Sequence, residues 1–261
     1  MIGTSGWDYK QWESTFYSGK CSFGEYSQHF NIVELNCTFY KTPSVKAVSK
    51  WKTDAPNGFK YIVKVNRYLT HSKKLNDWNT LFQEFHTITK GLGETLSGYL
   101  IQLPPQMTIK TLDRIVEMAK FNKTTFPEID FYVEFRHSSL FCLKVYKALA
   151  GLINIVFVNQ YGVTDKMDKG FSPKLQDFEL VKNTKTYFRC HGTWESQPYC
   201  GDYSDEDLML IASLKPDIVC FDNTDSYRDQ IELHIPGKIV VKNTGKPLLP
   251  SAIADAKKLI F

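Results

Sequence analysis

The chain has 261 residues (30.1 kDa), of which 43% are hydrophobic, 14% aromatic and 23% charged. This composition excludes a disordered, collagen-like or disulfide-scaffold protein. Lys and Arg outnumber Asp and Glu by 32 to 28, an excess too small to indicate a nucleic-acid-binding protein, which would need a clustered basic face. No apolar run approaches the roughly 18 residues that span a bilayer. Strand-like sequence starts at Met1 and leaves no room for a signal peptide, and the six cysteines form no C-x-x-C pair. We therefore expect a cytoplasmic protein.

Short β-rich runs alternate with amphipathic helical segments along the chain. The predicted strands are Ile2–Ser5, Ile32–Asn36, Lys60–Val65, Gly98–Leu103, Phe131–Phe135, Ile153–Val158, Thr186–His191 and Asp217–Asp222. The predicted helical segments include Val45–Asp54, Trp78–Lys90, Lys110–Phe121 and Phe141–Leu149. Ser204 followed by Asp207 is typical of a capped helix start. Eight strands in this length predict an α/β fold, a single (β/α)8 TIM-type barrel over residues 1–261. An open doubly wound sheet is the alternative.

Polar residues interrupt these strands on one parity only. In Ile32–Asn36, for example, Val33 and Leu35 are apolar, whereas Glu34 and Asn36 share the other face. Parallel strands buried on both faces are usually continuous apolar runs, so period-two geometry predicts that the polar groups point into the barrel. They lie near the C-terminal strand ends, where barrel active sites are built. The set expected in one cavity is Glu34, Lys64, Gln102, Glu134, Arg136, Arg189 and Asp222.

The two glutamates are candidate acid/base groups. Arg136 on the same strand should keep Glu134 ionised, which suits a base, whereas the more apolar surroundings of Glu34 suit an acid. Lys64 could bind an anion or, with a lowered pKa, act as a Schiff-base nucleophile. An ion pair between Lys64 and Glu34 or Glu134 is the competing interpretation.

The remaining candidates would bind substrate or move protons. Arg136 and Arg189 offer forked donors suited to phosphate or carboxylate. His191 and His71 titrate near neutral pH and could transfer protons, although a lone histidine is more often structural. The predicted substrate-binding set is Trp7, Asn36, Tyr40, His71, Gln102, Arg136, Arg189, Asp222 and Asn223. Aromatic residues at strand ends, including Trp7, Tyr9, Tyr40 and Tyr199, could stack on a sugar or base.

Six motifs in order carry a family resemblance. They are Gly3-Thr4-Ser5-Gly6-Trp7, Val33 to Tyr40, Val63-Lys64 with Thr70-His71, Gln102-Leu103-Pro104-Pro105, Glu134-Phe135-Arg136-His137 and Arg189-Cys190-His191-Gly192. Over roughly residues 1–224 the chain resembles the DUF72 (YecE-like) family. The resemblance implies a TIM barrel and little about the reaction. Leu140 stands where the family usually has Trp, and Asp222-Asn223 where Asn-Asn is usual.

A metal site is not favoured. Glu34, Glu134, His191 and Asp222 are ligand types that sugar-isomerase and endonuclease IV-like barrels use for divalent ions, but three cations in the same mouth would repel a dication. No H-x-H or H-E-x-x-H spacing offsets this objection. Cys37 and Cys190 fall on the helix-facing parity and are predicted to be small core residues.

These features predict a cofactor-independent enzyme acting on a small anionic or sugar-like molecule at the barrel mouth. Glu34, Lys64, Glu134 and His191 would be catalytic. A metal-assisted phosphodiesterase or other nucleic-acid-processing enzyme is one alternative, and a non-catalytic protein that binds an anionic ligand is another. No membrane partner is expected.

Overall fold

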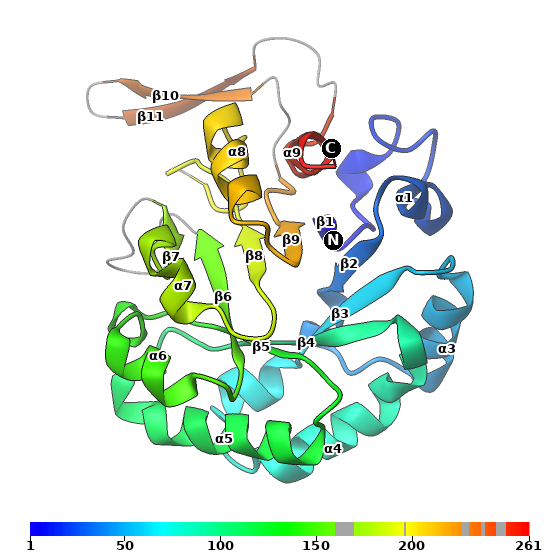
Figure 1. The fold of residues 1–261 in the computed structure, drawn as a ribbon. Coiled ribbons are helices and arrows are strands. Elements are labelled where there is room, and N and C mark those ends of the chain that lie inside the picture. The colour runs from blue at the N-terminus through cyan, green and yellow to red at the C-terminus, as the bar shows by residue number, and fades with distance from the viewer. Residues whose placement is uncertain (160–169, 196, 226–229, 236–237, 244–248, 261) are drawn as a thin grey trace.

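The computed structural model describes residues 1–159, 170–195, 197–225, 230–235, 238–243 and 249–260 (Figure 1). Eight parallel strands pair in the order β5-β4-β3-β2-β1-β9-β8-β6, and a further pairing of β5 with β6 closes the ring. These strands are β1 (Ile2–Ser5), β2 (Ile32–Leu35), β3 (Lys60–Lys64), β4 (Leu96–Gln102), β5 (Phe131–Glu134), β6 (Asn154–Asn159), β8 (Tyr187–Cys190) and β9 (Ile218–Phe221). The TIM barrel is thereby confirmed, and the open sheet is excluded.

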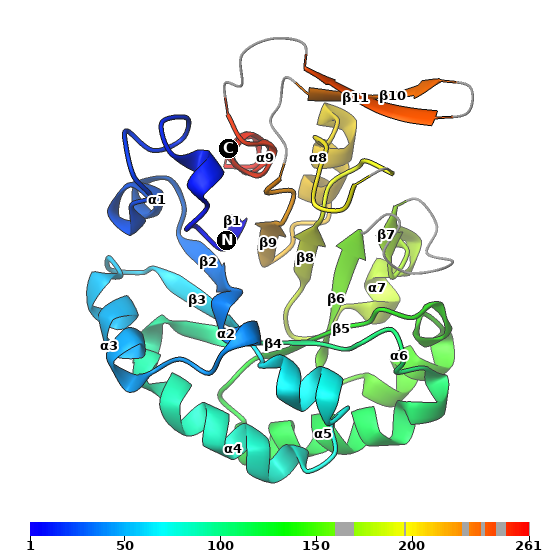
Figure 2. The same ribbon diagram turned by 180° about the vertical axis from the view of Figure 1, so that it is seen from behind.

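Helices surround this ring, as the two opposite views show (Figures 1 and 2). They are α1 (Phe23–His29), α2 (Cys37–Tyr40), α3 (Val45–Asp54), α4 (Trp78–Thr89), α5 (Leu112–Thr125), α6 (Leu143–Leu149), α7 (Phe178–Val181), α8 (Asp205–Ser213) and α9 (Ser251–Lys258). The predicted bounds of α3 are reproduced. The helix start at Ser204 is also confirmed, because its hydroxyl accepts a hydrogen bond from Asp207 N at 3.1 Å and the Asp207 side chain bonds back to Ser204. None of the helices among the described residues has the length and apolarity to cross a membrane.

Three further strands were not predicted. β7 (Phe171–Ser172) pairs antiparallel with β6 at the rim of the barrel. β10 (Gln230–Ile235) and β11 (Lys238–Asn243) pair with each other as an antiparallel hairpin outside the barrel sheet. Its sequence lies beyond residues 1–224, the part of the chain that carries the family resemblance. The final helix, α9, returns to the barrel, where Ala252 N donates to Asn223 O at 3.2 Å.

The barrel interior contains an apolar cluster on the same strand parity as the polar candidates. Its members are Ile32, Ile62, Leu100, Tyr132, Val156, Tyr187, Ile218 and Cys220, all at most 1% exposed. Most of them precede a polar candidate by two residues, as Ile32 precedes Glu34 and Ile62 precedes Lys64. Since alternate side chains of a strand share a face, these apolar groups support the polar layer from below. The helix-facing parity joins the larger core between strands and helices.

Candidate active site

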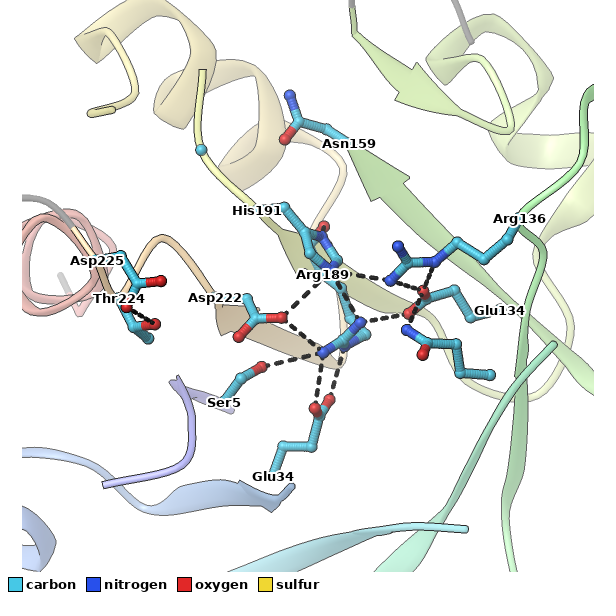
Figure 3. A network of polar contacts seen from close by, with 12 residues as sticks. Ser5, Glu34, Glu134, Arg136, Asn159, Arg189, His191, Asp222, Thr224 and Asp225 are labelled. Carbon is cyan, nitrogen blue, oxygen red and sulfur yellow. Dashed lines mark hydrogen bonds and ion pairs between the residues drawn. The ribbon is translucent and has the colours of Figure 1, made fainter. Parts of the chain in front are cut away.

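The guanidinium group of Arg189 lies at the centre of the polar layer (Figure 3). Its Nε and Nη2 donate to the two carboxylate oxygens of Glu34, each at 2.7 Å. Nη1 lies 2.5 Å from Glu134 Oε2, and Nη2 lies 2.9 Å from Asp222 Oδ2 and 3.3 Å from Ser5 Oγ. Arg189 is 0% exposed. All three guanidinium nitrogens are therefore engaged within the protein, and Arg189 joins three strands through their acids.

Tyr187 completes the surroundings of Glu34. It precedes Arg189 by two residues on β8, and its hydroxyl donates to Glu34 Oε2. Both carboxylate oxygens of Glu34 thus act as acceptors, from one guanidinium and one phenol. This geometry differs from the expectation that Glu34 delivers a proton to substrate. It fits a carboxylate that holds Arg189 in place.

Glu134 anchors the other side of the network. Its Oε1 accepts from Gln102 Nε2 at 2.8 Å and forms a salt bridge with Arg136. Burial alone would raise the pKa of Glu134, but Arg136 and Arg189 outweigh it and hold that pKa well below its usual range. The direction of this shift agrees with the prediction that Glu134 is ionised.

The same contacts engage Arg136 and His191. Arg136 is 5% exposed. Its Nη2 lies 3.2 Å from His191 Nε2 and also forms the salt bridge with Glu134. Burial and the neighbouring Arg189 hold the pKa of His191 well below 6.5, so its ring is neutral at physiological pH. The two arginines were expected to present forks to an anion. Arg189 has no free fork, and neither arginine lines the cavity described next.

A cavity of about 510 Å³ opens at the C-terminal ends of β1, β2, β3 and β9. It lies where barrel enzymes bind substrate and has the size of a small-molecule site. Its lining combines aromatic rings with carboxylates, an amide and one amine. The lining residues are Gly6, Trp7, Asp8, Tyr9, Glu34, Leu35, Asn36, Cys37, Tyr40, Trp51, Lys64, Tyr199, Asp222, Thr224 and Asp225.

Lys64 is the buried amine of this cavity. It is 8% exposed, and its Nζ lies 4.7 Å from the ring centre of Phe39. No carboxylate of the described residues lies within 4.0 Å of it, so the expected alternative of an ion pair with Glu34 or Glu134 is not formed. Burial, reinforced by the charge of Arg189, lowers the pKa of Lys64 to about 8.

Asp222 is the buried acid of the same cavity. Its Oδ2 contacts Arg189 and lies 3.2 Å from His191 Nε2, whereas the other oxygen carries no contact in Figure 3. Burial raises the pKa of Asp222 to about 7, although Arg189 opposes the shift. Asp222 was predicted only to bind substrate. A carboxyl with a pKa near 7 suits proton transfer near neutrality.

The other predicted site residues divide into two groups. Trp7, Asn36 and Tyr40 line the cavity, as expected. Gln102, His71 and Asn223 do not: Gln102 binds Glu134, and Asn223 donates to Gly201 O and Asp255 Oδ2, each at 2.8 Å. His71 packs against Phe39, and burial together with Lys64 lowers its pKa to about 4.

Sequence reasoning missed several lining groups. Asp8, Asp225 and Trp51 were not singled out, because they come from loops and a helix and no strand parity marks them. Cys37 was expected in the core, but it is exposed at the cavity because β2 ends at Leu35 and the chain turns into α2. Cys190 is buried, as predicted.

The acidic residues do not fit a divalent metal. Glu34, Glu134 and Asp222 converge, but on the Arg189 guanidinium, whose nitrogens occupy the position a cation would need. Within the described part of the chain, no group of three or more His, Cys, Asp or Glu side chains could hold a metal ion. The arginine therefore supplies the charge balance that a metal would otherwise supply.

Comparison with known proteins assigns the family. The model for "Protein of unknown function DUF72" matches residues 1–223. UPF0759 protein YunF of Bacillus subtilis (strain 168) is 28% identical over 199 residues, which cover 73% of this chain and 69% of YunF. UPF0759 protein YecE of Escherichia coli (strain K12) is 29% identical over 140 residues, 54% of this chain and 49% of YecE, so the match spans about half of that relative.

A solved structure agrees with the fold. The crystal structure of a DUF72 family protein from Enterococcus faecalis V583 superposes with a TM-score of 0.70 at 16% identity, covering 98% of this chain and 92% of that chain. The ordered motifs that carry the resemblance lie at the C-terminal ends of the strands and in the segments that follow them. With a family match over residues 1–223, this chain belongs to the DUF72 family.

Proposed function

We propose that this protein is a cofactor-independent enzyme that acts on a small sugar-like aldehyde or ketone through an imine at Lys64. The supporting observation is Lys64 itself, a buried amine that faces the cavity without an ion pair among the described residues. An amine with a pKa near 8 is about one-tenth neutral at pH 7, whereas an ordinary lysine is neutral to only about one part in three thousand. Lys64 is thus available as a nucleophile.

Asp222 is the proton-transfer partner in this proposal. Neutral Lys64 Nζ attacks the carbonyl carbon, and the C=O π electrons move to oxygen, which takes a proton from the Asp222 carboxyl. The nitrogen then loses a proton to Asp222, which becomes the acid again. Asp222 donates this proton to the carbinolamine hydroxyl, the C–O bond breaks and water leaves, so that Asp222 ends as a carboxylate beside the iminium. The product is an iminium at Lys64, which can stabilise a carbanion at the adjacent carbon.

The remaining polar layer positions Asp222. Arg189 holds Asp222 Oδ2, and Glu34 and Glu134 hold Arg189. His191 contacts Asp222 on the same oxygen. In this proposal Glu34, Glu134 and His191 therefore act through Asp222 rather than on the substrate. A metal-assisted phosphodiesterase is not favoured, because Arg189 occupies the centre of the acidic cluster.

Reductive trapping tests the proposal. The full chain is incubated with dihydroxyacetone and cyanoborohydride at pH 7, and the labelled lysine is located by peptide mass spectrometry. We expect modification concentrated at Lys64 and lost in Lys64→Arg. A matched control, Lys60→Arg, changes a lysine on the same strand whose Nζ donates to Glu94 O at 2.7 Å, and it should label as wild type does. Labelling spread over surface lysines, with Lys64 not enriched, would overturn the proposal.

A further inference from the structure

The cavity wall has an excess of acidic groups. Besides Glu34 and Asp222 it includes Asp8 and Asp225, and among the described residues Lys64 is the single Lys or Arg side chain in the lining. Arg189, which does not line the cavity, balances the charges of Glu34 and Asp222 through ion pairs. Asp8 and Asp225 are exposed, and across the described ranges neither lies within 4.0 Å of a cationic side chain. Two acidic residues without an ion-pair partner in the described part of the chain therefore line the ligand space.

This charge distribution disfavours an anionic substrate. A phosphate or carboxylate in the cavity would approach Asp8 and Asp225, and like charges brought together oppose binding. Protonated Lys64 would attract an anion, but the form that attacks a carbonyl is neutral and does not offset this repulsion. Arg136 and Arg189, the cations predicted to bind an anion, do not line the cavity. The expected ligand was anionic or sugar-like, and the charge of the cavity favours the sugar-like alternative.

The other lining groups suit hydroxyl groups and C–H faces. Asn36 lines the cavity as a polar amide, and its buried Oδ1 accepts no hydrogen bond from the described residues. Trp7, Tyr40, Trp51 and Tyr199 provide aromatic surface against which a sugar can pack. The cavity volume of about 510 Å³ accommodates a molecule of that size.

We propose that the substrate is an uncharged polyhydroxy aldehyde or ketone, and that Asp8 and Asp225 select against its phosphorylated or carboxylated counterparts. This inference rests on the proposed imine chemistry at Lys64 and adds the substrate class. Asp8 and Asp225 are specificity-determining residues in this view. They touch neither the carbonyl carbon nor the amine.

A matched pair of probes tests the selection. Glyceraldehyde and glyceraldehyde 3-phosphate differ only in the phosphate, and each is trapped on Lys64 with cyanoborohydride at pH 8 and low salt. Rates are divided by those for Nα-acetyl-lysine, which removes intrinsic reactivity. We expect at least about a tenfold preference for glyceraldehyde. The preference should fall to below about threefold in Asp8→Asn/Asp225→Asn, and it should also fall at high salt, where exposed charges are screened.

A double variant of two glutamates outside the cavity is the control. Glu84→Gln/Glu117→Gln makes the same change in net charge on exposed positions of α4 and α5, and it should retain the wild-type preference. Failure of both probes to label Lys64 would overturn the proposed function. Labelling without preference, or faster labelling by the phosphate, would overturn this inference and leave the imine chemistry standing. An unchanged preference in Asp8→Asn/Asp225→Asn would also overturn it.

Discussion

Replacement of Arg189 by Met tests the central ion network. Methionine keeps much of the buried volume but removes a guanidinium that contacts Glu34 at 2.7 Å, Glu134 at 2.5 Å and Asp222 at 2.9 Å. Three buried acids would then share only Arg136 and Lys64. Removal of one partner from a buried ion pair costs about 3–5 kcal/mol, because it leaves uncompensated charge in the interior. For a domain of this size, that corresponds to a Tm lowered by about 6–20 °C.

The assay is denaturant unfolding followed by tryptophan fluorescence, with Arg114→Met as the matched control. Arg114 lies on α5, where its Nη1 donates to Lys74 O at 3.0 Å in an exposed contact. Its loss should change the free energy of unfolding by less than about 0.5 kcal/mol. Equal stability of Arg189→Met and wild type would refute the network, since the three acids would then not depend on the arginine.

The pH dependence of this destabilisation has a defined sign. In wild type, the pKa of Glu134 is depressed in the folded state, so its contribution to stability exists above its unfolded pKa and is lost as pH falls. In Arg189→Met, the buried acids should have raised pKa values, so their penalty is present at neutral pH and relieved as they protonate. Between pH 8 and pH 5 the second effect narrows the stability difference between wild type and variant, and below the unfolded pKa of Glu134, near 4.5, the first effect narrows it further. A constant difference would contradict this account.

Two further outcomes are expected. The rate of trapping at Lys64 should follow a bell-shaped pH profile with a maximum near pH 7.5, because neutral Lys64 (pKa about 8) and protonated Asp222 (pKa about 7) are required together and each is roughly one-quarter populated there. The Asp222→Asn variant should be slower and should lose the decline in rate at alkaline pH. A wild-type rate that rises monotonically to pH 10 would eliminate Asp222 as the acid. Gly3→Ala should destabilise the barrel by more than about 2 kcal/mol, because its Cβ would overlap the carbonyl oxygen of Ile32 on the paired strand β2. Thermal unfolding measures this effect, and Gly19→Ala, which has open space around it, is the control. An equal loss of stability in the two variants would contradict the steric argument.

The alternation of residues in the strands was sufficient to predict the barrel and its polar layer. Ile32 and Glu34 share a face because side chains alternate with period two, so the inward position of Glu34 follows from local sequence. The same rule placed Lys64, Glu134 and Arg189 at the mouth. It also covers Tyr187, which has the parity of Arg189 and was overlooked because a tyrosine in a strand resembles an ordinary core residue.

Tertiary structure decided which of these groups bind one another and which face the ligand. Parity cannot show that Arg189 binds Glu34, Glu134 and Asp222 simultaneously, because those contacts join residues separated by up to 155 positions in the chain. It also cannot show that Lys64 has no carboxylate within ion-pair distance in the described structure, which depends on where the arginine lies. Asp8 and Asp225 follow β1 and β9, and these strands meet only when the barrel closes. The charge of the cavity therefore depends on the closure of the barrel, which a local sequence pattern does not determine.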